Sequence, residues 1–333
     1  MRSPLLDLPG AVAGDAIDAD VAAHYGSFNG EQRTLEAGEG FVDLSHRDVV
    51  RIEGHDRLTW LHSLTTQYFL DLPPQLWTGA LILSPNGHVE HAFFGYDDGE
   101  AFVAHTEPGY APALIEFLDK MRFMTRVEVT DVSADIAVTW RPKPVVEVRG
   151  VPVTSLETPE AGRGLYDNYE FVPRVQLTGY AEAAGPACGM WAFEALRIAR
   201  GEPRLGIDTD HRTIPNEAGW IGPAVHLDKG CYRGQETVAR VHTLGRPPRR
   251  LTLLHLDGSE NRLPAAGSEL KFGDKVVGFV GSSARHHELG PIALAMVKRN
   301  VSLDAQLDAD SLAAAQEVLV DPEVGLHVSP RVR

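Results

Sequence analysis

The chain has 333 residues, which corresponds to about two domains at roughly 150 residues per domain. Hydrophobic residues make up 43% and charged residues 23%, the values of an ordinary globular protein rather than a low-complexity one. The formal net charge of −15 opposes non-specific attraction to nucleic acid or to an anionic membrane, so bulk nucleic-acid binding is not expected, although a local basic patch could still bind an anion.

The first half of the chain alternates strand and helix patterns. Residues 1–39 are rich in small, acidic and turn-forming residues, and we predict an extension packed on the body. A strand is predicted at 49–52, and a helix begins at Asp56 and ends at Pro73-Pro74. Strands at 80–83, 89–96 and 101–104 are predicted around Asn86-Gly87 and Asp98-Gly99, which are strong hairpin signals.

Apolar residues spaced 3, 1, 3, 1 and 3 apart between Tyr110 and Met121 predict an amphipathic helix. Strands at 127–129 and 136–140 follow it. Because hairpins and crossovers are interleaved, an α+β arrangement is favoured over a doubly wound parallel sheet.

The second half begins with a predicted strand at 171–177. A helix is predicted from Pro186 to Gly201, with Cys188 on one face. Residues 202–245 lack periodicity, and so long an irregular stretch is usually functional or disordered. Residues 245–250 are interpreted as a solvated linker, and the short strands at 251–256, 269–272, 276–280 and 292–297 predict a small all-β domain.

Cysteine content and apolar runs limit the cellular setting. Cys188 and Cys231 are too few for a disulfide framework, or for a four-thiolate iron–sulfur cluster or structural zinc within one chain. No segment reaches the ~20 apolar residues of a membrane span, and Met1–Leu5 does not begin a signal peptide. We therefore predict a cytoplasmic protein without a membrane partner or a stable metal. The histidines also lack metal-ligand spacing.

The densest group of unusual residues is the segment Lys229–Glu236, here called the signature loop. Lys229 and Arg233 both lie within two residues of Cys231, and nearby positive charge would favour the reactive thiolate. The loop also holds Gly230, Tyr232, Gly234, Gln235 and Glu236, a composition suited to a polar, partly anionic small molecule. A structural interpretation stays open, because a lone cysteine is most often a small buried hydrophobe.

The signature loop, Lys229-Gly230-Cys231-Tyr232-x-Gly234-Gln235-Glu236, resembles that of the folate-binding YgfZ proteins, relatives of the glycine cleavage T-protein. Further stretches agree in order: Asp43–Arg47 with Arg51–Asp56, then Trp60-Leu61 with Leu64-Thr65, and Leu196–Gly206 with Ile214–Glu217. The resemblance covers about residues 40 to 250, and the later strands suit the C-terminal barrel of the family.

The resemblance implies two interleaved α+β (ferredoxin-like) domains around a central cleft, plus a small C-terminal β-barrel. The domains would be an extension at 1–39, a folate-binding region at 40–245 and a barrel at 246–333. It further implies bound tetrahydrofolate, iron–sulfur client or assembly proteins as partners, and a role in maintaining iron–sulfur enzymes and some tRNA modifications. Lys229 and Cys231 would be the working residues, with the rest of the loop, Glu217 and Glu90 contacting the ligand.

The sequence departs from the T-protein pattern at three places, the first being Cys231-Tyr232 where T-proteins carry Asp-Phe, which argues against glycine cleavage. Glu90 and His91 stand where T-proteins carry paired aspartates, which argues against glycine cleavage. Ala199 stands where many relatives have a glutamate that holds the pterin, and an unmatched buried donor costs about 1–3 kcal/mol. Either Glu217 or Glu194 substitutes, or pterin affinity is weak, or the ligand differs.

Three hypotheses follow from these residues. The first is a folate-binding accessory protein for iron–sulfur enzymes, with Cys231 as a redox-responsive or transiently ligating thiol. The second is a folate-dependent aminomethyl or one-carbon transferase, which requires Glu90 or His91 near the reactive folate nitrogen. The third is a non-catalytic scaffold that has lost the ligand, motivated by Ala199.

Overall fold

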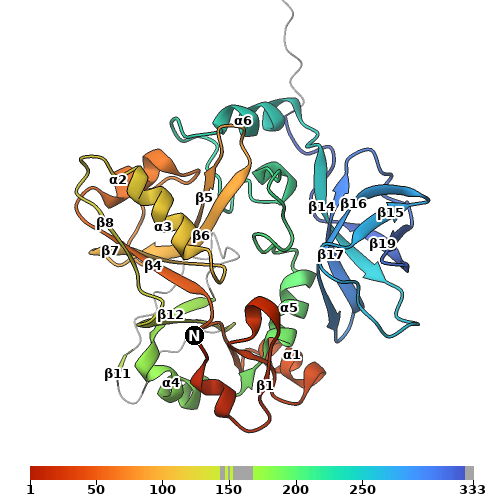
Figure 1. Cartoon of the computed structure of the whole chain (residues 1–333), viewed down its shortest axis with the longest axis horizontal. Coiled ribbons are helices and arrows are strands. Elements are labelled where there is room, and N and C mark those ends of the chain that lie inside the picture. Colours follow the sequence, from red (N-terminus) through yellow and green to blue (C-terminus); the bar gives the residue numbers. More distant parts are fainter. Residues whose placement is uncertain (143–146, 149–150, 153–167, 327–333) are drawn as a thin grey trace, which may run out of the picture. The chain divides into compact units, whose positions relative to one another are not determined.

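The computed structural model describes residues 1–142, 147–148, 151–152 and 168–326 (Figure 1). Residue contacts divide the chain into two compact units that are not contiguous in sequence. Unit 1 comprises Met1–His62, Tyr68–Ala80 and Phe93–Phe193, and unit 2 comprises Ser63–Gln67, Leu81–Ala92 and the chain from Glu194 onward. The domain boundaries expected at 39/40 and 245/246 stay a prediction. The two compact units are each made of several separate segments of the chain, so their limits do not test those boundaries.

Unit 1 is built around two sheets. One has the strand order β12-β9-β3-β13, in which β13 runs parallel to β3 and the other neighbours are antiparallel. Its strands are β3 (Phe41–Asp43), β9 (Ile136–Trp140), β12 (Tyr169–Pro173) and β13 (Ala187–Cys188). Cys188 therefore lies on a strand and not on a helix face, which corrects the sequence-based expectation.

The second sheet has the order β5-β6-β7-β4-β8. Its strands are β4 (Asp48–Glu53), β5 (Thr78–Leu83), β6 (Val89–Asp97), β7 (Ala101–Thr106) and β8 (Glu128–Asp131). The hairpins predicted at Asn86-Gly87 and Asp98-Gly99 are confirmed, and Gly87 and Gly99 have φ of 83° and 99°. Strands β5 and β6 each begin in one unit and end in the other.

The helices match the sequence patterns unevenly. Helix α3 (Ala111–Lys120) confirms the amphipathic pattern, whereas α2 (Arg57–Leu64) ends well before Pro73-Pro74. Helix α6 (Gln235–Leu244) lies in the stretch expected to be irregular, and the strand expected at 171–177 ends at Pro173 and is followed by helix α4 (Leu177–Ala184), which was not predicted. The remaining elements are α1 (Phe28–Glu36), α5 (Met190–Ala199), the 3₁₀ turns η1 (Pro4–Asp7), η2 (Ala16–Asp18), η3 (Arg174–Gln176) and η4 (Pro215–Glu217), and the short pairs β1 (Val12–Ala13)–β2 (Ala22–His24) and β10 (Glu147–Val148)–β11 (Val151–Pro152).

Six strands close into a barrel at the C-terminal end of the described chain, in the order β14-β17-β16-β15-β18-β19. They are β14 (Arg249–Leu256), β15 (Glu269–Phe272), β16 (Lys275–His286), β17 (Gly290–Lys298), β18 (Leu307–Ala309) and β19 (Leu312–Val318). Closure leaves no unpaired sheet edge. The α+β class and the small C-terminal barrel predicted from the sequence are thus confirmed.

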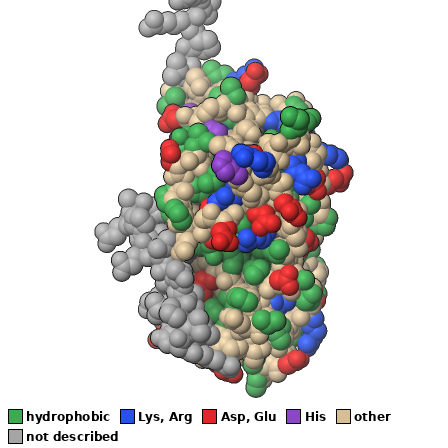
Figure 2. All heavy atoms as spheres, turned by 90° about the vertical axis from the view of Figure 1, so that its left-hand side faces the viewer, with side chains coloured by type: hydrophobic (Ala, Val, Ile, Leu, Met, Phe, Trp, Pro, Cys, Tyr) green, Lys and Arg blue, Asp and Glu red, His purple; other side chains and the backbone are tan. Residues whose placement is uncertain are grey.

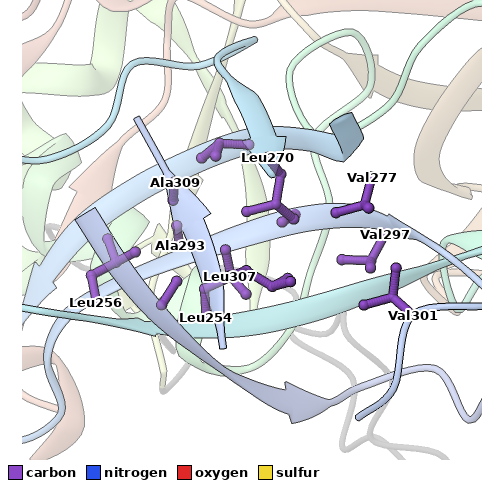
Figure 3. Close-up of a cluster of buried hydrophobic side chains, with 12 residues drawn as sticks. Leu254, Leu256, Leu270, Val277, Ala293, Val297, Val301, Leu307 and Ala309 are labelled. Atoms are coloured by element: carbon purple, nitrogen blue, oxygen red, sulfur yellow. The ribbon is translucent and has the colours of Figure 1, made fainter. Parts of the chain in front are cut away.

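Alternate residues of β14 face two different apolar clusters. Leu254 and Leu256 belong to the cluster that fills the barrel (Figure 3). Leu251 and Leu253 instead pack in a second cluster with Ala195 and Ile198 of α5. This alternation is the period-2 pattern of a strand that is covered on both faces, and it anchors helix α5 on the outside of the barrel.

Arg249 and Arg250, two of the three arginines expected in a solvated linker, begin strand β14 of the barrel instead, whereas Arg246 is exposed and pairs with Glu323 (2.9 Å). Arg250 is fully buried, and its Nη2 donates to Gln316 Oε1 (2.8 Å) and to the carbonyl of Val301 (3.2 Å). The expectation was wrong because guanidinium groups can be buried when carbonyl and amide oxygens accept from them.

None of the helices among the described residues is long and apolar enough to cross a membrane. On the face in Figure 2, basic and acidic side chains lie next to one another with apolar ones between them. Ion pairs in unit 1 have the same character, for example Arg126 with Asp56 (2.6 Å) and Arg122 with Asp119 (3.7 Å). Many positive charges in this unit are therefore compensated locally.

Candidate functional site

The signature loop leads directly into helix α6. Gly234 precedes the helix with φ of 79°, and Gln235 Oε1 accepts a hydrogen bond from the Tyr232 N–H (2.7 Å). An added Cβ at Gly234 would lie 2.5 Å from the Ser84 carbonyl oxygen and 2.9 Å from Gly87 Cα. The loop is therefore packed against the tip of the β5–β6 hairpin, and glycine is required at that contact.

Lys229 is the buried cation of the loop. Its Nζ donates to the Thr65 carbonyl (2.5 Å) and lies 5.1 Å from the centre of the Tyr232 ring. Burial lowers the pKa of Lys229 to about 8 and raises the pKa of Tyr232 to about 12. An amine with this pKa is partly neutral near physiological pH, which distinguishes it from a surface lysine.

Cys231 is exposed, so it has the access that a working thiol requires. The two neighbouring cations have other partners: Lys229 bonds Thr65, and Arg233 Nη1 pairs with Glu90 Oε2 at 3.0 Å. The positive charges of Lys229 and Arg233 are thus directed to other partners than the Cys231 sulfur. Gly230 has open space around its Cα, and Glu236 is exposed in the first turn of α6.

His91 lies beside Glu90 on β6 and is mostly buried. Burial, followed by the charge of Arg233, lowers the pKa of His91 to about 4. The imidazole is therefore neutral at physiological pH, and its environment disfavours the protonated form. The signature loop and these two residues lie far apart in the sequence, and the Arg233–Glu90 pair joins them in the fold.

The carboxylates considered as substitutes for the missing pterin ligand have structural partners. Glu217 accepts from the Ile214 N–H (3.1 Å) and from Arg249 Nε and Nη2 (both 2.9 Å). Glu194 pairs with Arg197 (2.6 Å) and Arg204 (3.4 Å). Ala199 packs against the cluster between α5 and the barrel. The structure thus joins these carboxylates to arginines rather than to the signature loop.

An aromatic cluster in unit 1, consisting of Trp77, Tyr96, His105, Tyr169 and Phe171, was not predicted from the sequence. Ring centres lie 4.9 Å apart for Trp77 and Phe171, 5.2 Å for Trp77 and Tyr96, and 4.7 Å for His105 and Tyr169. Trp77, Tyr96 and Phe171 are only partly buried. The only sequence signal is that Tyr169 and Phe171 are two residues apart on one strand and so share a face.

A buried cation borders the aromatic cluster. The Arg47 guanidinium carbon lies 5.4 Å from the centre of the Tyr169 ring, and Nη1 is 3.3 Å from His105 Nδ1. Burial, together with the charge of Arg47, lowers the pKa of His105 well below its usual value. His105 Nε2 has no hydrogen-bond partner among the described residues. Partly exposed rings beside a buried cation can stack a flat heterocycle.

Comparisons with known proteins identify the fold. No family model matches the chain. A chloroplastic protein of Arabidopsis thaliana, named as a transferase, is 26% identical over 80% of this chain and 67% of its own length. The aminomethyltransferase of Streptomyces coelicolor is 26% identical over 86% of each chain. The crystal structure of the glycine cleavage system aminomethyltransferase T from Bartonella henselae superposes with a TM-score of 0.77, at 18% identity, covering 96% of this chain and 97% of that one.

The molecule is therefore an α+β protein with a C-terminal barrel built on the plan of aminomethyltransferase T. The chain therefore shares the fold of the T-protein, and the resemblance found in its sequence is confirmed at the level of the fold.

Proposed function

We propose that this chain is a tetrahydrofolate-binding accessory protein that helps to maintain iron–sulfur enzymes through the thiol of Cys231. The aromatic cluster of unit 1 carries the folate part of the proposal. Its partly exposed rings offer the faces that a pterin or an aminobenzoyl ring stacks on, and the fold is that of relatives named aminomethyltransferase. Arg47, at 5.4 Å from Tyr169, supplies positive charge beside those rings.

Calorimetric titration with tetrahydrofolate under anaerobic conditions tests the folate part. We expect micromolar binding by the wild type and at least tenfold weaker binding by Trp77→Leu, because base–aromatic stacking contributes about 1–3 kcal/mol. Trp191→Leu is the matched control, since Trp191 is an exposed tryptophan outside the cluster. Absence of binding by the wild type at high micromolar ligand would remove the folate part and favour the scaffold hypothesis.

Lys229→Ala and Lys229→Arg form a second pair of variants for the same titration. Lys229 is buried and bonded to Thr65, and we propose that the partly neutral amine contacts the ligand. The alanine variant should lose affinity and the arginine variant should recover little, because its charge is permanent.

The exposed position of Cys231 supports the redox or transient-ligand part of the proposal. A thiol can coordinate the iron of a partner protein, or react with an oxidant, only where that partner or oxidant can reach it. We propose that the site lies in the cytoplasm and that iron–sulfur client or assembly proteins approach the signature loop, without any membrane or nucleic-acid partner.

Complementation tests this part. In cells that lack the protein, the activity of an endogenous iron–sulfur dehydratase per amount of its polypeptide should fall under oxidative stress. The wild type and Cys188→Ser should restore it, and Cys231→Ser should not. Cys188 is the matched control because it is a buried cysteine on β13. Full restoration by Cys231→Ser would refute a role for the thiol.

A second candidate function is folate-dependent aminomethyl or one-carbon transfer. The Arg233–Glu90 ion pair (3.0 Å) favours it, because this pair joins the signature loop to the segment that holds Glu90 and His91, the two side chains considered for proton transfer to the folate. Tetrahydrofolate-dependent ammonia release from a protein-bound aminomethyl donor would measure the activity. Turnover lost in His91→Ala but kept in Glu90→Gln would support it, and absence of turnover in the wild type would exclude it.

A further inference from the structure

A polar pocket of about 440 Å³ lies within unit 1, at loops that connect its two sheets. One wall is the β3–β4 connection, with Ser45, His46 and Arg47. The other is the β8–β9 connection, with Asp131 and Ser133, and Arg174 follows strand β12. None of the fold comparisons or the proposed function assigns a ligand to this pocket.

The cationic side of the pocket is held in place by the backbone. Arg174 donates from Nε (3.1 Å) and Nη2 (2.9 Å) to the Ser133 carbonyl, and from Nη2 to the Ser45 carbonyl (2.6 Å). These bonds fix the guanidinium across both loops and use carbonyl oxygens rather than a carboxylate. The positive charge of Arg174 is therefore positioned without being neutralised by those partners.

Three donors beside the pocket lack an acceptor. Arg174 Nη1, Arg47 Nε and the Ser45 hydroxyl have no hydrogen-bond partner among the described residues and are shielded from water. Ser45 and Arg47 are 1% and 4% exposed. Buried donors without an acceptor are costly, so an oxygen ligand that draws them toward the pocket by a side-chain rotation would lower that cost.

The opposite charge lines the same pocket. Asp131 Oδ1 accepts from the Ser133 N–H (2.9 Å) and hydroxyl (2.5 Å), and Asp48 Oδ2 accepts from the Ala111 N–H (2.9 Å). The pKa of Asp48 is raised by burial and further by the charge of Asp131. The two carboxylates therefore repel one another, and a cation between them would relieve that repulsion.

The other charges near the pocket have partners of their own, although the terminal ammonium also acts on Asp48, and the Asp43 and Asp20 carboxylates also act on Arg174. His46 Nε2 pairs with Asp18 (2.9 Å), Arg47 pairs with Glu107 (3.4 Å), and the terminal ammonium pairs with Asp20 (2.5 Å). The pocket thus offers three donor atoms without acceptors, on Arg174, Arg47 and Ser45, and a pair of carboxylates. A phosphate would be repelled by the carboxylates of Asp48 and Asp131, and a simple cation would leave the three donor atoms without an acceptor.

We propose that this pocket binds a small zwitterion of the α-amino acid class. Its carboxylate takes hydrogen bonds from Arg174 and Ser45, and its ammonium lies between Asp48 and Asp131. Ser133 positions both charged ends of the site. Its carbonyl accepts hydrogen bonds from Arg174, and its N–H and hydroxyl donate to Asp131. The inference does not depend on folate binding, because the residues assigned to the zwitterion (Arg174, Ser45, Asp48 and Asp131) are not part of the aromatic cluster, although Arg47 borders both sites.

The test uses the full chain with its purification tag at the C-terminus, because Met1 also lines the pocket. Each of the twenty protein amino acids is titrated singly at up to 10 mM and followed by NMR and by thermal shift. The best binder is compared with its N-acetyl and its carboxamide derivatives, each of which lacks one charge. We expect both derivatives to bind at least tenfold more weakly than the amino acid.

Two variants remove one end of the site each. Arg174→Gln and Asp131→Asn should each weaken binding tenfold or more, and Arg122→Gln, an exposed arginine of the same unit, should not change it. Because Arg174 also bridges two loops, the comparison of derivatives on the wild type decides the matter if that variant fails to fold. The proposal is overturned if none of the twenty binds, if the N-acetyl derivative or acetate binds as tightly, or if the carboxamide does.

Discussion

Cys231 and Cys188 differ in the two properties that control thiol reactivity. Cys231 is exposed, whereas burial and then the charge of Glu31 raise the pKa of Cys188 to about 12. We expect iodoacetamide at pH 7.5 to alkylate Cys231 at least tenfold faster than Cys188, followed by peptide mass spectrometry over time. Denatured protein, in which both should react alike, is the control. Equal, slow labelling of both thiols in the folded protein would contradict a reactive Cys231 and support the structural interpretation of this residue.

Lys229 should impose a pH dependence on stability. Burial lowers its pKa from 10.5 to about 8, so between these values the unfolded chain binds more protons than the folded one. The free energy of unfolding contributed by this group therefore rises as the pH increases from about 8 to about 10.5. Below that window the folded protein carries the full cost of a buried charge.

Urea unfolding of the wild type and of Lys229→Met at pH 7.5, 8.5 and 9.5 measures this effect. The stability of the wild type relative to the variant should increase with pH. Other titrating groups are common to both proteins and cancel in the difference. Parallel profiles would show that the Lys229 pKa is not lowered in solution.

The signature loop and helix α6 meet the β5–β6 hairpin at one glycine. Gly234→Ala should destabilise the protein by about 2–3 kcal/mol, because the left-handed backbone alone costs about 1–2 kcal/mol and the new methyl would meet the Ser84 carbonyl at 2.5 Å. Gly230→Ala, in the same loop but with open space around it, should change stability by less than about 1 kcal/mol. Chemical denaturation of both variants makes the comparison. Equal losses would mean that the loop does not pack on the hairpin.

Elements with a local signal could be predicted from the sequence, and those without one could not. The Asn86-Gly87 and Asp98-Gly99 hairpins depend on turn residues that need no distant partner. Helix α6 was not predicted because its sequence is polar on most sides, with Val238 as its buried residue. Helix α4 is short and interrupted by Gly179, and β13 depends on pairing with β3, which no local pattern reveals.

The candidate site was predictable to a similar extent. The signature loop is contiguous, so its residues could be named from the sequence alone. The aromatic cluster combines Trp77 with residues of β6, β7 and β12, and only the fold brings those strands together. The main partner of Glu217 was likewise hidden, because Arg249 is 32 residues away in the sequence, whereas Glu194 pairs with Arg197 only three residues along the same helix.

At the scale of the whole molecule, the barrel depends on the chain that precedes it. Leu251 and Leu253 on its outer side pack with Ala195 and Ile198 of α5. A fragment of residues 246–333 would leave these leucines in water, and burying such a side chain contributes about 1.5–3 kcal/mol.

We therefore expect the fragment 246–333 to melt at a lower temperature than a fragment of residues 186–333 that retains α5. Circular dichroism melts of both fragments at matched concentration test this, with light scattering to detect aggregation. An equal melting temperature, with monomeric fragments, would show that the barrel is an independent domain and would support the boundary predicted at residue 246.

The passage of β5 and β6 from one unit into the other has a consequence for how such a protein can evolve. Each unit takes its residues from separate stretches of the gene, with Ser63–Gln67 and Leu81–Ala92 of unit 2 lying inside the coding region of unit 1. A single recombination event cannot add, remove or exchange either unit intact. New specificities in this architecture must therefore arise by point substitution within an inherited whole, and during synthesis on the ribosome unit 2 cannot be completed until the final strands have emerged.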